Sequence, residues 1–397
     1  MHEHDFRKRE RLSSNIRQLS AITLFSYIGI ALVGTIWAIY MESIVHNPST
    51  VGLISTWFGV AGIFAFLFFI PIIEKHNKTK ILALVLLLYA ISYFLFAFVD
   101  DIFALIILGT LIYVIASARV STIGIIMRNK SKDNEVSKNT GVMYTVFNFA
   151  WLVGPVVAGF VAQKIGIRFV FIIAGILVGI SFILLKVLGL NDSGISKRPE
   201  KNVFKLTKEF FARKKFVLSY IIHGGVNFWW AFIYIYIPMF IVDSGRSDLV
   251  VGYFLAGVIA PLIFLEYPIG ILASKFGFKK MFFRGFLIVA IAAGLCFLIN
   301  DFYAILILLV LGSVGMAMLE PTTEAYFFDI TTKSEKDKFY GVQNTTVDVN
   351  YAVSLFAVAM IIKFLPFKYS FIFISAVMLA FALISLRIKD VFEKKRG

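Results

Sequence analysis

The chain repeats itself at a constant offset of 200 residues, and this repeat constrains its fold more than any other feature. The offset holds without a gap from residue 51 to residue 345. It pairs Val51-Gly52 with Val251-Gly252, Ile63-Phe64 with Ile263-Phe264, Lys75 with Lys275, Lys80 with Lys280, Asp101 with Asp301, and Gly141-Val142 with Gly341-Val342. Two equal hydrophobic halves indicate a membrane protein that arose by duplication. In proteins of this architecture the working site is expected between the halves.

The composition excludes an ordinary soluble domain, because 59% of the residues are hydrophobic and only 16% are charged. The apolar residues form runs of about 20, which is long enough to cross a hydrocarbon core. Because a backbone in lipid must satisfy its own hydrogen bonds, runs of this length predict helices. We therefore predict an all-α membrane protein with twelve transmembrane helices, six in each half, at 21–41, 51–73, 81–99, 102–126, 141–162, 169–190, 216–242, 249–273, 281–299, 302–328, 340–365 and 369–388.

The net charge of +15 is distributed unevenly between the two sides of these spans. Of the 39 Lys and Arg residues, 32 lie on the side that holds both termini and five lie on the other side. Such an asymmetry predicts that both termini are cytoplasmic and that the protein is a multi-pass protein of the plasma membrane. The basic charge is then explained by topology and by contact with membrane lipids, so no nucleic-acid partner is expected.

The chain divides into an N-terminal six-helix bundle at 1–190, a cytoplasmic linker at 191–215 and a C-terminal six-helix bundle at 216–397. Part of the linker, from Val203 to Phe211, is expected to form a short helix on the membrane surface. Its expected apolar anchors are Phe204, Phe210 and Phe211. The single cysteine, Cys296, lies within a span, so no disulfide within the chain is possible.

Two segments between spans carry a recognisable motif, GILASKFGFKK at 270–280 and its repeat counterpart IPIIEKHNKTK at 70–80. Both resemble the signature loop of the major facilitator superfamily, G-x-L-a-D-r-x-G-r-k. A tight turn is expected at Gly277 and at Asn77, since both residue types tolerate a positive φ. The resemblance implies a twelve-helix fold and a role in the conformational change for the loop residues, namely Glu74, Lys75, Lys78, Gly270, Lys275 and Gly277.

The fifth span contains AWLVGPVVAG at 150–159, which resembles the g-x-x-x-G-P-x-x-G-G element of the antiporter branches of that family. Ala150, Gly154 and Ala158 form a stripe of small residues that permits close helix approach. Pro155 removes a backbone hydrogen bond and is expected to bend the helix. Gly154 and Pro155 are therefore further candidates for the conformational change, although a generic packing face explains the stripe equally well.

Charges within the spans are expensive to bury and are therefore the first candidates for substrate or proton binding. Arg119 lies in the fourth span, and Glu320 and Glu324 lie in the tenth. The offset maps Arg119 onto Leu319, beside Glu320, and the family resemblance implies that both spans line a central cavity. We expect a pair that forms in one conformation and separates in another. A static pair and a water-exposed vestibule remain alternatives.

Two further acids are candidates for carrying a proton, because burial raises the pKa of a carboxyl group. Asp348 is the repeat counterpart of Asn148, and Glu266 lies in the eighth span. Glu266 has an alternative interpretation as a partner of Lys275 or Arg284.

The seventh span places His223, Asn227, Trp230 and Tyr234 on one helical face. Such a polar and aromatic stripe is typical of a site for an amphipathic ligand, whereas aromatic packing between helices is the alternative. Tyr27, Gly34 and Trp37 are weaker candidates for the opposite wall of the cavity.

The sequence contains no catalytic motif, nucleotide-binding loop or metal-ligand cluster, so neither an enzyme nor a cofactor is expected. We predict a monomeric secondary transporter that works by alternating access, with protons and a small-molecule substrate as its partners. Proton-coupled export of an amphipathic compound is the leading hypothesis. Proton-coupled uptake of a sugar or other polar nutrient, and a non-transporting receptor or scaffold, are the alternatives.

Overall fold

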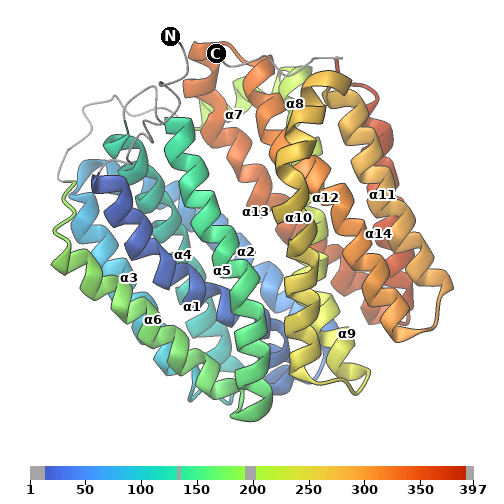
Figure 1. Cartoon of the computed structure of the whole chain (residues 1–397), viewed down its shortest axis with the longest axis horizontal. Helices are drawn as coiled ribbons and strands as arrows, with labels where there is room; N and C mark the ends of the chain where they lie inside the picture. Colours follow the sequence, from blue (N-terminus) through green and yellow to red (C-terminus); the bar gives the residue numbers. More distant parts are fainter. Residues whose placement is uncertain (1–13, 132–135, 193–202, 390–397) are drawn as a thin grey trace, which may run out of the picture.

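A computed structural model describes residues 14–131, 136–192 and 203–389 of the chain, and most of them are helical (Figure 1). Within these ranges, 12 helical segments are long and apolar enough to cross a membrane. The predicted number of transmembrane helices is therefore confirmed. The ends of the bundle that hold Ser14, the short helix α7 and Ser385 lie on one face of the molecule, called here the terminus face (Figure 1).

The first half consists of six long helices. Asp101 begins one of them by accepting hydrogen bonds from the N–H groups of Phe103 and Ala104, each at 2.9 Å. Its repeat counterpart Asp301 caps the equivalent helix of the second half through the N–H of Ala304 at 2.7 Å. The helices of the first half are α1 (Ser14–Val45), α2 (Pro48–Lys75), α3 (Lys78–Phe96), α4 (Ile102–Lys130), α5 (Val136–Lys164) and α6 (Ile167–Val187).

The second half repeats this arrangement with one irregularity. The single helix expected at 216–242 is interrupted by a π-helical turn, η1 (Phe232–Tyr236), directly before Pro238. Because Pro238 has no N–H to donate, the regular hydrogen-bond ladder cannot continue through this point. The helices of the second half are α8 (Lys214–Ala231), α9 (Ile237–Asp243), α10 (Asp248–Phe276), α11 (Phe278–Leu298), α12 (Phe302–Ile330), α13 (Lys333–Phe364) and α14 (Lys368–Ser385).

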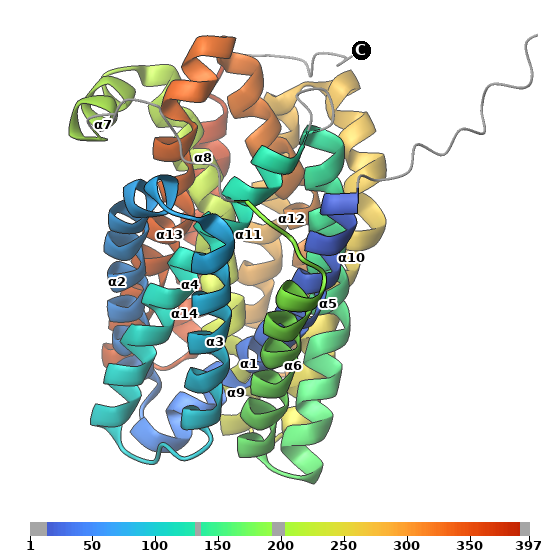
Figure 2. The ribbon, with the colours of Figure 1, turned by 90° about the vertical axis from the view of Figure 1, so that its left-hand side faces the viewer.

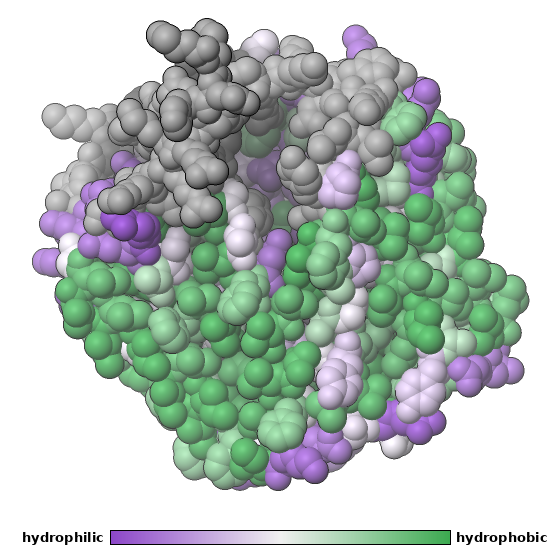
Figure 3. Space-filling view, viewed as in Figure 1, coloured by the Kyte–Doolittle hydropathy of each residue, from purple (hydrophilic) through white to green (hydrophobic). Residues whose placement is uncertain are grey.

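The halves meet mainly along two pairs of helices, α5 with α10 and α2 with α13. By the offset, α2 corresponds to α10 and α5 corresponds to α13, so these two interfaces are repeat counterparts of each other. Large hydrophobic side chains such as Phe64, Phe103 and Phe264 are exposed on the outside of the bundle. Figure 3 shows the resulting apolar surface below the terminus face, as expected of a surface in contact with lipid.

The linker helix α7 (Val203–Phe211) forms where the sequence predicts it, but it packs differently from the expectation. Phe210 is fully buried and its ring stacks on Phe216 at a centroid distance of 5.1 Å. Phe339 of α13 completes the cluster at 5.9 Å from Phe210. The prediction that Phe210 anchors the helix in lipid is therefore wrong, because an aromatic pocket of the second half offers better packing. Figure 2 shows α7 beside α8 and α13.

One ion pair reinforces this attachment of α7, and two others join the start of α8 to α13. Glu335 accepts hydrogen bonds from Arg213 and Lys215, and Glu209 of α7 accepts one from Lys338. Glu335 also closes a capping box with Thr332 at the start of α13. The hydrogen bond from the Thr332 N–H, followed by that from Lys215, holds the pKa of the Glu335 carboxyl below its usual value.

Candidate functional site

A run of aromatic side chains crosses the middle of the molecule from the first half to the second. Tyr27 of α1 contacts Phe147 of α5 edge to face at 5.4 Å, and Phe147 lies 6.0 Å from Trp151. Trp151 then meets Tyr234 of η1 at 4.9 Å, and Tyr234 lies 5.5 Å from Trp230. These centroid distances are those of interacting rings. The contact between Trp151 and Tyr234 joins the two halves, so relative motion of the halves would change this run.

A glycine on α1 leaves space for the indole ring of Trp151. A Cβ atom on Gly34 of α1 would lie 2.7 Å from the indole of Trp151, so only glycine leaves the ring its place. The predicted stripe of small residues on α5 also faces α1, where a Cβ on Gly154 would lie 2.6 Å from that of Ala31. Ala150 and Ala158 of the same stripe are fully buried. The stripe therefore sets the close approach of α5 to α1, and Trp151 lies beside it against Gly34.

Arg119 of α4 lies at the first-half end of this run. Its side chain is only 6% exposed, and its guanidinium lies 5.3 Å from the ring of Tyr27 and 5.8 Å from that of Tyr89. Two of its nitrogens, Nε and Nη1, are buried without a hydrogen-bond partner. Among the described residues, no ion pair includes Arg119. A buried cation with unused N–H donors is an energetically costly arrangement that an acceptor group would relieve.

Glu320 and Glu324 lie on α12 and are separate from Arg119 in this conformation. Glu320 is exposed although it lies within a span. Glu324 accepts a hydrogen bond from Tyr340 of α13 at 2.8 Å. Leu319, the counterpart of Arg119, is fully buried. The expected pair of Arg119 with Glu320 is therefore not formed here, and whether it forms in another conformation stays a prediction.

Asp348 of α13 is exposed in the middle of the bundle, and its repeat counterpart Asn148 of α5 is half-buried. Figure 3 shows a recess between the halves at the terminus face, with hydrophilic side chains inside it. A carboxylate at this depth of a membrane is expected to face the bundle interior or a water-filled cavity. Asn227 instead donates to the backbone carbonyl of His223 at 3.4 Å, so it stays close to its own helix.

The motif loops are only partly within the described structure, because the side chains of Glu74, Glu266, Gly270 and Lys275 lie outside the described residues. Gly277 adopts φ 79°, as expected of a tight turn that favours glycine. The same expectation for Asn77 is wrong.

Asn77 has φ −67°, because its side chain caps α3 by accepting the N–H of Lys80 at 3.0 Å. Lys75 is exposed, whereas Lys78 is buried and its N–H bonds the carbonyl of Asp192 at 3.0 Å.

At the face opposite the termini, the two halves are in close contact. A Cβ on Gly159 of α5 would lie 2.7 Å from the carbonyl oxygen of Asp248, 3.1 Å from the Cα of Leu249 and 3.2 Å from that of Gly252. The backbone carbonyl of Pro155 also abuts Gly252. At the equivalent interface, Ser49 of α2 donates to the Ala359 carbonyl of α13 at 2.8 Å. The molecule is thus closed at this face and recessed at the other.

Three residues of the central site were not identified from the sequence. Phe147 and Trp151 are one helical turn apart on α5 and lie on nearly the same face as the small-residue stripe, so the stripe itself was the available signal. Tyr89 of α3 gave no signal, because nothing in its own helix distinguishes it from a packing aromatic. Conversely, Trp37 lies in the core of the first half, 5.1 Å from Phe96, and not along the central run. Within the described residues, no group of three or more His, Cys, Asp or Glu is arranged to hold a metal ion.

The fold and this central, two-sided site define a multi-pass membrane protein of two six-helix halves, closed on one face. The family model of the Major Facilitator Superfamily matches residues 19–265 and 245–397. The chain therefore belongs to the Major Facilitator Superfamily of transporters, and the resemblance seen in its motifs is confirmed.

Two similar proteins match most of this chain. An uncharacterized MFS-type transporter of Methanocaldococcus jannaschii is 21% identical over 344 residues, covering 85% of this chain and 89% of that protein. The quinolone resistance protein NorA of Staphylococcus aureus is 24% identical over 335 residues, covering 81% and 82%.

Solved structures at 13% identity share the fold. A POT family transporter in complex with 5-aminolevulinic acid superimposes with a TM-score of 0.79, covering 94% of this chain and 95% of that one. A bacterial homologue of the human lysosomal transporter Spinster, inward-facing and occupied, gives 0.73 with 93% and 95% covered.

Proposed function

We propose that the chain is a proton-coupled transporter that exports amphipathic, aromatic small molecules. The observation that carries this proposal is the aromatic run that joins the halves between Trp151 and Tyr234, with the buried Arg119 near one end. Rings bind flat apolar groups by stacking, and the unused N–H groups of Arg119 suit a carboxylate or carbonyl on the same molecule. The similarity to the quinolone resistance protein NorA supports this class of substrate.

The coupling site is proposed at the acids within the spans, with Glu320 and Glu324 first and Asp348 second. Glu320 is exposed within a span that the family resemblance places at the central cavity, so a proton on it would change the charge of that cavity. A carboxylate reached by water from the recess can exchange protons with one side only in this conformation. Rocking of one half against the other would then expose the same group to the opposite side.

Transport by the purified full chain in proteoliposomes tests the proposal. A fluoroquinolone and a fluorescent aromatic dye serve as substrates, and an imposed proton gradient serves as the driving force. We expect gradient-driven extrusion in wild type, and its loss in the double variant Glu320→Gln, Glu324→Gln. Intact gradient-driven transport in that variant contradicts the coupling assignment, and accumulation in place of extrusion supports the uptake alternative.

Substrate binding is tested separately by following Trp fluorescence in the absence of a gradient. Trp151→Ala is expected to weaken binding about 10-fold or more, since a stacked aromatic pair contributes ~0.5–1.5 kcal/mol beyond the buried area. Trp151→Phe keeps a ring and is expected to retain most of the affinity. Equal binding by all three proteins refutes the placement of the substrate on this run.

A further inference from the structure

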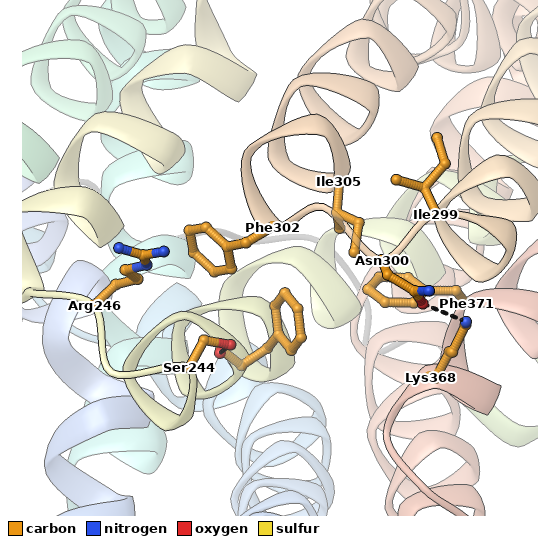
Figure 4. Close-up of a pocket in the computed structure, with 9 residues that line it drawn as sticks. Ser244, Arg246, Ile299, Asn300, Phe302, Ile305, Lys368 and Phe371 are labelled. Carbon is orange, nitrogen blue, oxygen red and sulfur yellow. Dashed lines mark hydrogen bonds between the residues drawn. The ribbon is translucent and has the colours of Figure 1, made fainter.

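A pocket on the face opposite the termini lies apart from the central site. Its cavity volume is about 250 Å³, and its walls come from the end of α9, the α11–α12 connection and the start of α14. Phe240, Phe302 and Phe371 give it an aromatic lining. Two cations, Arg246 and Lys368, lie on opposite sides of it (Figure 4).

Neither cation is neutralised by a carboxylate in the described structure. The guanidinium of Arg246 lies over the rings of Phe302 and Tyr303, at 5.2 and 5.1 Å from their centroids. The ammonium of Lys368 donates to the neutral amide oxygen of Asn300 at 2.8 Å (Figure 4). Ion pairs between described residues include neither side chain. The pocket therefore combines two positive charges with an apolar floor.

The equivalent cation in the first half is paired with a carboxylate. The offset maps Lys368 onto Arg168 and Asn300 onto Asp100, and in the first half these two form an ion pair. The second half thus keeps the cation and replaces its carboxylate with an amide. A purely structural role for this cation would favour the ion pair in both halves. A cation that is paired in the first half and unpaired with a carboxylate in the second is therefore expected of a binding site.

The space itself also differs between the copies. Phe240 corresponds to Tyr40, whose hydroxyl donates to the carbonyl oxygens of Phe96 and Val99 at 2.8 and 3.0 Å. Tyr40 also packs on Phe171 at 4.6 Å, whereas the equivalent rings of Phe240 and Phe371 are 5.9 Å apart. The second half lacks the hydroxyl and has a looser ring contact where its pocket opens.

We propose that this pocket binds a phosphate-bearing anion, supplied by the headgroup of an anionic phospholipid in the leaflet opposite the termini. The pocket lies where the helices end, which is the depth of the headgroups. Exposed apolar and aromatic side chains surround it, among them Leu298, Tyr303 and Tyr369, and these are suited to the membrane interface. Arg and Lys together recognise a phosphodiester, while the aromatic floor accepts the adjoining glycerol and upper acyl groups.

Binding is measured as the shift in thermal unfolding of the purified full chain when phosphatidylglycerol is added to mixed micelles of detergent and phosphatidylcholine. The informative variant is Asn300→Asp, which restores the carboxylate of the first half. Asn300→Asp is expected to unfold at the wild-type temperature or above in phosphatidylcholine alone. Both Asn300→Asp and Lys368→Gln are expected to bind phosphatidylglycerol about 10-fold more weakly than wild type. Lys164→Gln removes an exposed cation from the same face away from the pocket and serves as the matched control.

Equal responses of wild type, Asn300→Asp and Lys368→Gln to phosphatidylglycerol would overturn the proposal, since the lipid would then act only on the basic terminus face. A second arm replaces the lipid with inorganic phosphate. Stabilisation by phosphate that equals that of the lipid and is lost in Asn300→Asp assigns the site to a soluble anion and overturns the lipid source. Stabilisation by the lipid alone, lost in both pocket variants and kept in Lys164→Gln, supports the proposal.

Discussion

The contact of Gly159 with α10 leads to a quantitative prediction about the conformational equilibrium. In Gly159→Ala, the added Cβ lies 2.7 Å from the Asp248 carbonyl oxygen, whereas ordinary contact begins at 3.4 Å. Its other near neighbours, Leu249 and Gly252, are also met at backbone atoms. Because no side chain can rotate away, α5 and α10 must separate by several tenths of an ångström.

Overpacking of this kind costs about 1–3 kcal/mol. The gain in helix propensity from Gly to Ala applies to every conformation in which α5 is helical, so it cancels from the equilibrium between conformations. The substitution should therefore disfavour the closed face selectively. The ratio of open to closed molecules at this face is expected to rise roughly 5- to 150-fold.

This ratio can be measured by double electron–electron resonance between two spin labels. The labels are attached at Lys164→Cys in the first half and Lys363→Cys in the second, in a Cys296→Ala background. Both positions are exposed near the closed face. Gly159→Ala is expected to add a longer-distance population. Gly179→Ala is the matched control, because a Cβ at Gly179 meets nothing within 4 Å. A distance distribution identical in both variants and in the parent would refute the view that this backbone contact closes the molecule.

Two further predictions concern the second half at the terminus face, one for the start of α13 and one for the attachment of α7. Glu335→Gln removes the charge that Arg213 and Lys215 bind, while the Gln amide oxygen can still accept the Thr332 N–H. Exposed ion pairs of this kind contribute about 0.2–1 kcal/mol. Because the pKa of Glu335 is lowered in the folded protein, the charged side chain stabilises the fold at neutral pH, and this stabilisation is lost as the pH falls below about 4.5. The difference in unfolding temperature between wild type and Glu335→Gln should therefore shrink on acidification. A difference that stays constant with pH contradicts the assignment. Phe210→Ala removes a fully buried ring and is expected to destabilise the docking of α7 by about 3–5 kcal/mol, which is measured as faster hydrogen exchange in α7. Phe211 is 43% exposed, so Phe211→Ala should leave hydrogen exchange nearly unchanged. Equal exchange rates in the two Phe variants would show that Phe210 does not hold the helix.

The sequence predicts the helices well, because each span is a long apolar run and each half repeats the other. It predicts α7 at its observed bounds for the same local reason. The π-helical turn η1 was not predicted, since it depends on how Pro238 is accommodated within a packed bundle. The burial of Phe210 was missed because a hydrophobic face indicates that a helix packs on something, without showing whether that partner is lipid or protein.

The site is predicted less completely, and the reason lies in the geometry of a repeat. The offset correctly relates Arg119 to Leu319, but two repeat counterparts point into their own halves. Leu319 is fully buried in the second half and Arg119 is enclosed by Tyr27 and Tyr89 in the first. Glu320, one residue further along α12, faces about 100° away from Leu319. Similar depth therefore did not imply contact, and the expected ion pair required knowledge of orientation.

Differences between the copies nevertheless indicate where the two halves have specialised. Within the spans, Asn148 against Asp348 places an acid in only one half. At the membrane face, Asp100 against Asn300 leaves a cation unneutralised in only one half. The two halves of a duplicated fold need the same packing. A polar difference at equivalent positions is therefore better explained by function than by packing. The differing residues within the spans belong to the proposed transport path, and those at the closed face line the proposed lipid pocket. Substitutions at one of these sites can therefore be tested without disturbing the other.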